Sequence, residues 1–178
     1  VDRQGIIHSD YPGITDEQQR TLEFTNLENK SGTLQDALTG TDIFIGVSAP
    51  NILTAEDIGL MNEDPIVFAM ANPIPEILPD VAKAAGVAIM GTGRSDFPNQ
   101  INNVSAFPGI FKGALEANAT MINEEMRTAA SYAIAGLVDD SELTVEYIIP
   151  DSLDERVVPA VSKAVKEAAI ATNVIRQI

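Results

Sequence analysis

Short apolar runs alternate with helix signals along the first half of the chain, and this alternation limits the possible folds more than any other feature. The apolar runs cover residues 42–47, 65–71 and 87–90, and each has the length of a strand. A helix-start pattern at Thr33 precedes the first run, and another at Thr54 falls between the first and the second. Strands alternating with helices favour βαβ units. We therefore predict a doubly wound α/β domain with a parallel sheet, in which 42–47 is buried on both faces.

Helical patterns account for most of the remaining chain. Thr15 and Gln18 form a capping-box pattern, which predicts a helix that extends towards Asn29. After the third apolar run, the spacing of apolar residues becomes helical and predicts a C-terminal helical extension. The remaining helices are expected over residues 33–40, 80–85, 104–118 and 123–138 and from near Pro159 onward.

Composition excludes several classes of partner. The 178 residues carry a formal net charge of −15, and such an acidic surface repels nucleic acid and anionic membranes. No apolar run approaches the roughly 20 residues of a membrane span. The absence of cysteine fits a reducing compartment, and we expect a cytoplasmic protein. The opening residues 1–5 contain neither Met nor a capping signal, which indicates a fragment that starts inside an element.

Small and polar residues follow each predicted strand. Ser48 follows the first strand, Asn72 the second, and the glycine-rich segment 91–94 the third. Ligands of open parallel sheets bind outside the carboxyl ends of the strands. Because these residues carry few charges and include no P-loop lysine, they suit a nucleotide or a nicotinamide amide better than phosphoryl transfer.

Several of these polar residues have a structural alternative. Asn72 either faces a ligand or closes an Asx turn. In the pair Asn102 and Asn103, one amide can cap the following helix while the other faces a ligand. Asp2 can accept hydrogen bonds from a ribose or lie in a solvated loop. Arg94 and Asp96 are expected to form a local ion pair that shapes their loop.

Several long and specific motifs occupy residues 70–77, 92–104, 108–115, 122–126, 147–150 and 154–157. These motifs resemble the C-terminal half of bacterial malic enzymes. The resemblance covers nearly the whole chain. The family converts L-malate to pyruvate and CO₂ by oxidative decarboxylation, with NAD(P) and Mg²⁺ or Mn²⁺. The resemblance thus implies that residues 1–178 are the Rossmann-like NAD(P)-binding C-terminal domain of such an enzyme.

The resemblance also implies roles for individual residues. Asn72 corresponds to an asparagine that contacts nicotinamide and substrate, and Asn103 to a second asparagine with a similar role. Asp2 corresponds to the acid that binds the cofactor ribose, which favours NAD over NADP. Ser48 corresponds to a loop that lines the adenosine side of the cofactor.

Other parts of the family's machinery have no counterpart in the sequence. The tyrosine acid, the lysine base, the metal-binding carboxylates and the Gly-x-Gly-x-x-Gly turn lie upstream of Val1 in the family. We therefore assign no catalytic or metal-binding residue and expect the isolated chain to be inactive. Its expected partners are an N-terminal catalytic domain of the same protein and further copies in a homo-oligomer. Two alternatives are part of a malolactic enzyme and a non-catalytic nucleotide-binding regulatory module.

Overall fold

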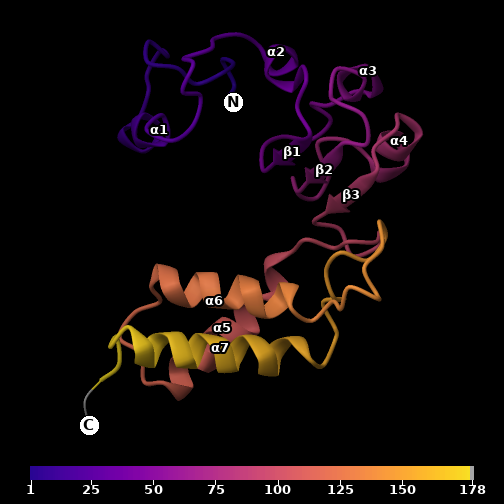
Figure 1. Ribbon diagram of the computed structural model, residues 1–178. Coiled ribbons are helices and arrows are strands. Elements are labelled where there is room, and N and C mark those ends of the chain that lie inside the picture. Colours follow the sequence, from indigo (N-terminus) through magenta and orange to yellow (C-terminus); the bar gives the residue numbers. More distant parts are fainter. Residues whose placement is uncertain (177–178) are drawn as a thin grey trace.

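A three-stranded parallel sheet organises the first half of the molecule (Figure 1). The structure is a computed structural model that describes residues 1–176. The strands β1 (Ile43–Gly46), β2 (Ile66–Ala69) and β3 (Ile89–Thr92) lie in the order β1-β2-β3, and helices α3 (Ala55–Ile58) and α4 (Pro79–Ala84) lie in the crossovers. The predicted α/β fold with a parallel sheet is confirmed, although β3 lies two residues further along the chain than predicted.

The helices α2, α3 and α4 pack on one face of the sheet. That core combines aliphatic side chains from strands and helices: Leu38, Ile58, Val67, Ala82 and Met90. On the opposite face, Ile43 and Ile45 of β1 are 52% and 64% exposed. The expectation that residues 42–47 are buried on both faces is therefore wrong. The reason is that α2 (Leu34–Leu38), α3 and α4 all contribute to the same core.

Helix α1 (Asp16–Thr21) is shorter than predicted. It begins as expected, because Thr15 Oγ1 accepts a hydrogen bond from the Gln18 backbone N–H and the Gln18 side chain accepts one from Thr15 N–H. It does not extend to Asn29. Asn26 and Asn29 have φ angles of 45° and 52°, a left-handed conformation that asparagine tolerates and a helix cannot contain.

The other short helices begin at predicted signals. Thr33 and Thr54 form capping boxes at α2 and α3. Gly40, with a φ of 72°, follows the end of α2 in the conformation expected after a helix. Helix α4 begins at Pro79, a favoured first-turn residue, one position before the predicted start.

The second half of the molecule is helical, which confirms the predicted C-terminal extension (Figure 1). The elements are η1 (Asn103–Ser105), α5 (Phe107–Glu116), α6 (Glu124–Ala135) and α7 (Val157–Ala171). The helix expected over 104–118 is interrupted at Ala106, between η1 and α5. None of the helices in the described part of the chain combines the length and apolar character that crossing a bilayer requires.

Two glycines let α5 approach α7 closely. A Cβ atom on Gly109 would lie 2.5 Å from Val161 Cβ, and one on Gly113 would lie 2.5 Å from the carbonyl oxygen of Ser162. Val161 and Val165 are completely buried in this contact, as the helical spacing of apolar residues predicts. Small residues on α5 therefore set the distance between the two helices.

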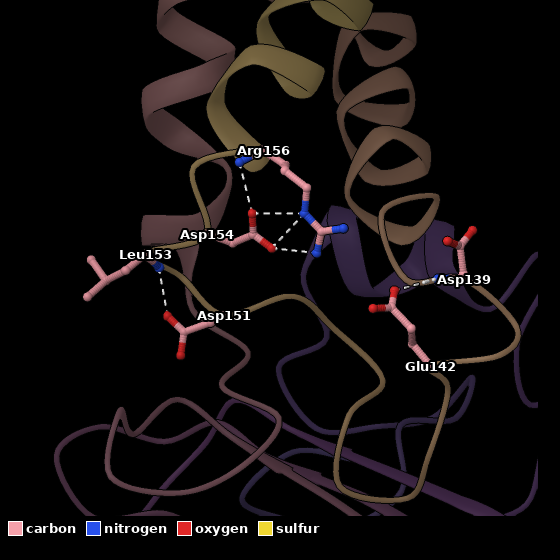
Figure 2. A network of polar contacts seen from close by, with 6 residues as sticks. All are labelled: Asp139, Glu142, Asp151, Leu153, Asp154 and Arg156. Atoms are coloured by element: carbon pink, nitrogen blue, oxygen red, sulfur yellow. Dashed lines mark hydrogen bonds and ion pairs between the residues drawn. The ribbon is translucent and has the colours of Figure 1, made fainter.

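A polar network precedes α7 (Figure 2). Asp154 accepts hydrogen bonds from the backbone N–H of Arg156 at 2.8 Å and from its guanidinium Nη2 at 2.7 Å. The hydrogen bonds and charge of Arg156 hold the pKa of the Asp154 carboxyl below its usual range. Because these contacts span only two residues, they fix the turn from which α7 starts.

Candidate functional site

The three predicted strand exits lie at one edge of the sheet. The register pairs Gly46 with Ala69 and Ala69 with Thr92, so all three strands end at the same level. Gly93 follows β3 directly, Ser48 comes two residues after β1, and Asn72 comes three residues after β2. The structure thus brings together the segments that the sequence predicted as ligand-binding, at the position where open parallel sheets bind their ligands.

A buried glutamate, Glu76, joins the exits of β1 and β2. Its Oε1 accepts hydrogen bonds from Ser48 N–H at 2.8 Å and from Ser48 Oγ at 3.1 Å. Its Oε2 accepts one from Ala71 N–H at 3.0 Å. Glu76 was not predicted as a site residue from the sequence. The available signal was an acid between the apolar residues Pro75 and Ile77, in a segment whose prolines keep it out of a helix.

The Asn72 side chain is exposed next to this glutamate-bound segment. In the described part of the chain it has no hydrogen-bond partner, so the Asx turn considered as an alternative is not formed. A side-chain amide offers two donors and one acceptor oxygen. Asn72 is therefore able to bind a polar ligand at the end of β2 without losing a contact within the protein.

The two adjacent asparagines beyond β3 have different surroundings. Asn102 is the cap: its Oδ1 accepts a hydrogen bond from Val104 N–H, and its Nδ2 donates one to Gly93 O, both at 3.0 Å. Asn103 is exposed at the first position of η1. One of the two amides was expected to cap the following helix, and Asn102 does so. The ligand contact expected of the other amide, that of Asn103, stays a prediction.

Asn99 is a second polar residue that was not predicted as part of the site from the sequence. It is buried with a φ of 53°, and its Nδ2 donates to Met90 O at 3.0 Å and to Val145 O at 2.9 Å. Its Oδ1 accepts from Ile148 N–H at 2.9 Å. Asn99 thereby fastens the exit of β3 to the segment between α6 and α7. Its only local signal was that asparagine tolerates a left-handed conformation.

The loop between β3 and Asn99 contains the predicted ion pair. Arg94 Nη2 lies 2.6 Å from Asp96 Oδ2, and the Arg94 guanidinium stands 5.4 Å from the centroid of the Phe97 ring. The hydrogen bond from Arg94 lowers the pKa of the Asp96 carboxyl. These contacts are local and shape the loop, as expected.

The contacts of Asp2 involve none of the strand-exit residues. Asp2 forms an isolated bridge with Gly5 and belongs to none of the three strands of the sheet. Its carboxylate accepts hydrogen bonds from Arg3 N–H at 2.6 Å and from Gln18 Nε2 at 2.8 Å. It lines a cavity of about 270 Å³ together with Tyr11 and other residues of the first 18.

Metal ligands are not grouped in this part of the protein. Within residues 1–176, no three or more His, Cys, Asp or Glu side chains are arranged to hold a metal ion. The strand exits carry the amides of Asn72 and Asn103, the hydroxyl of Ser48 and backbone groups, which can bind and orient a polar ligand.

Known proteins with similar sequences are malic enzymes. The sequence profile of the malic enzyme NAD-binding domain matches residues 1–177. The bifunctional malic/malolactic enzyme of Bacillus subtilis is 53% identical over 98% of this chain and 43% of its own length. The NAD-dependent malic enzyme of Geobacillus stearothermophilus is 54% identical over 99% of this chain and 37% of its own length. This chain thus spans about two fifths of the length of these two curated relatives.

Solved structures show the same relationship. The NAD-dependent malic enzyme of Thermotoga maritima superposes with a TM-score of 0.86 and 46% identity, over 93% of this chain and 44% of that one. The malic enzyme of Entamoeba histolytica gives a TM-score of 0.89 and 38% identity, over 100% of this chain and 38% of that one. Sequence and fold agree, and the chain belongs to the malic enzyme family, as its Rossmann-like NAD-binding domain.

Proposed function

We propose that this chain is the dinucleotide-binding part of a longer enzyme that converts L-malate to pyruvate and CO₂ by oxidative decarboxylation and reduces NAD⁺. The observation that carries the proposal is the exposed amide of Asn72 at the end of β2, beside the exits of β1 and β3. The family membership of the chain supplies the reaction class, since relatives that match nearly the whole chain are named malic enzymes.

The strand exits suit a dinucleotide on chemical grounds. When bound, NAD⁺ supplies the hydride acceptor for oxidation at C2 of malate. In this proposal, Asn72 and Asn103 bind the nicotinamide carboxamide or the substrate and hold the two in line, while Ser48 lines the adenosine side. Neutral amides bind a carboxamide or a carboxylate without adding charge, and correct positioning is worth several kcal/mol of barrier.

Asp2 is the proposed determinant of cofactor choice. Its carboxylate would accept hydrogen bonds from the ribose hydroxyls of NAD⁺ and repel the 2′-phosphate of NADP⁺. One oxygen already accepts from Gln18 Nε2 and the other from Arg3 N–H, but each carboxylate oxygen has a further lone pair. Relatives named for either cofactor match this chain, so its preference has to be measured.

The acid, the base and the Mg²⁺ or Mn²⁺ ligands belong, in this proposal, to a catalytic domain elsewhere in the same protein. The described residues contain no cluster of metal-ligating side chains, and the relatives are more than twice as long as the matched part. Residues 1–178 would then be the C-terminal cofactor domain of a homo-oligomeric enzyme that binds L-malate and releases pyruvate.

A second candidate is malolactic activity, because the Bacillus subtilis relative carries both activities in its name. One assay separates the two. The full-length protein is incubated with L-malate, NAD⁺ and Mn²⁺, with an EDTA-treated sample as control. We expect NADH and pyruvate in equal amounts. Lactate without accumulating NADH would favour the second candidate, and neither product would overturn both.

A further inference from the structure

Glu76 is a buried charge whose hydrogen bonds all come from uncharged groups. The side chain is completely buried, and its three hydrogen bonds come from two backbone N–H groups and one hydroxyl. A carboxylate in such a position is costly unless its acceptor oxygens are satisfied. Three donors on two oxygens meet this requirement, and they come from the exits of two different strands.

Backbone hydrogen bonds near Glu76 also connect the loop after β1 with the loop after β2. The Asn51 N–H donates to Pro75 O and the Leu53 N–H donates to Glu76 O, each at 3.0 Å. The loop after β1 therefore runs against the loop after β2. Strand β1 ends in Gly46 at this point, and a Cβ atom there would lie 2.6 Å from both Glu76 Cδ and Oε1. The space that a side chain would need at the end of β1 is thus filled by the carboxylate.

We propose that Glu76 is a positioning residue for the dinucleotide, an inference that rests on the proposed function. Oε1 holds Ser48 by its backbone and hydroxyl, while Oε2 holds Ala71, the residue before Asn72. The two candidate cofactor contacts are therefore fixed relative to one another by one rigid group. A site held in its binding geometry loses less entropy when the ligand binds, so this tie raises affinity without touching the ligand.

The chemistry of the tie requires a carboxylate. Both oxygens accept hydrogen bonds from N–H groups, and glutamine has only one acceptor oxygen. In Glu76→Gln, the amide nitrogen must face either Ser48 N–H or Ala71 N–H, so one exit is released. Glu76→Asp keeps both acceptor oxygens on a stem one methylene shorter and should restore part of the tie.

The test measures NAD⁺ binding and turnover in the full-length enzyme. We expect Glu76→Gln to raise the Kd and KM for NAD⁺ about tenfold, equivalent to about 1.4 kcal/mol, and Glu76→Asp to raise them less. The matched control is Asp57→Asn. Asp57 is also a buried carboxylate that accepts hydrogen bonds, from Thr54 and Gln35. It lies on α3, and among the described residues it has no hydrogen bond to the residues that the Glu76 carboxylate holds. This control should lower the melting temperature and leave the KM for NAD⁺ unchanged.

The outcomes separate this inference from the proposed function. If wild-type enzyme binds NAD⁺ and Glu76→Gln lowers only the melting temperature, Glu76 is structural and the inference is wrong. An equal rise of KM in Asp57→Asn would also overturn it, because the effect would then follow general destabilisation. Should Glu76→Gln fail to fold, an unchanged KM in Glu76→Asp contradicts the inference and a raised one supports it. Absence of NAD⁺ binding in the wild type would remove the proposed function and the inference together.

Discussion

The strand exits and the helices α5–α7 hold their backbones in place by different means. At the exits, the buried polar side chains of Glu76 and Asn99 tie together segments that are remote in sequence. Between α5 and α7, aliphatic side chains pack against the glycines of α5. Hydrogen bonds are directional, whereas apolar packing is not. Changes at the exits should therefore alter binding geometry, and changes in the helices should alter stability.

The strongest test of this contrast removes a large side chain from the helical core. Met126 of α6 is completely buried, and Met126→Ala should destabilise the protein by about 2–5 kcal/mol through the cavity it leaves. Thermal denaturation should show a clearly lower Tm, while the KM for NAD⁺ measured well below that temperature stays constant. Met121→Ala, at a 59% exposed position, is the control and should change neither. A large rise of KM in Met126→Ala would break the contrast.

Within the exits, the two adjacent asparagines should separate binding from stability. Asn103→Ala should lower kcat/KM for malate by one to two decades, since an unpaired ligand group costs roughly 1–3 kcal/mol. Its Tm should hardly change, because Asn103 is exposed. Asn102→Ala removes a cap and should cost about 1 kcal/mol of stability. If Asn103→Ala melts several degrees lower yet turns over malate normally, its assignment to the site is wrong.

A smaller effect is expected at Asp2, which lies outside the exits. Asp2→Ala should raise the KM for NAD⁺ and reduce discrimination against NADP⁺ about fivefold, the equivalent of one ordinary hydrogen bond of about 1 kcal/mol. The quantity to compare is the ratio of kcat/KM values for the two cofactors in the full-length enzyme. Asp10→Ala, another exposed aspartate of the N-terminal segment, serves as the control. An unchanged ratio in Asp2→Ala would remove Asp2 from the cofactor site.

The smallest effect concerns the turn before α7. The hydrogen bonds and charge of Arg156 lower the pKa of Asp154 in the folded protein, so the ionised carboxylate stabilises the fold above the unfolded pKa of about 4. This contribution is lost as the pH falls through the lowered folded pKa. Melting curves of wild type and Asp154→Asn should therefore differ slightly at pH 7 and converge below pH of about 4. A difference that stays constant down to pH of about 2 would contradict this account.

Local signals predicted the elements well, because their causes lie within a few residues. The capping box expected at Thr15 forms, and helices start at the signals expected at Thr33 and Thr54. One of the two adjacent asparagines, Asn102, is a cap, as the pair predicted. The length of α1 was wrong because left-handed asparagines end the helical path.

The tertiary ties were beyond the reach of local patterns. Glu76 bonds a residue 28 positions away, and Asn99 bonds residues 46 and 49 positions away. The sequence next to Glu76 and Asn99 does not indicate which distant residues they bond. The exposed side chains of Ile43 and Ile45 show the same limit, since an apolar run indicates a strand but not which faces are covered.

The Asn99 tie makes one backbone amide a reporter on a distant element. The Ile148 N–H lies between α6 and α7, yet its acceptor is a side chain held against β3 by Met90 O. Its exchange with deuterium should therefore require opening of the β3 exit rather than fraying of the adjacent helices. In native-state exchange experiments, the protection of Ile148 should follow that of the sheet, and NAD⁺ should slow its exchange if the dinucleotide binds at this edge.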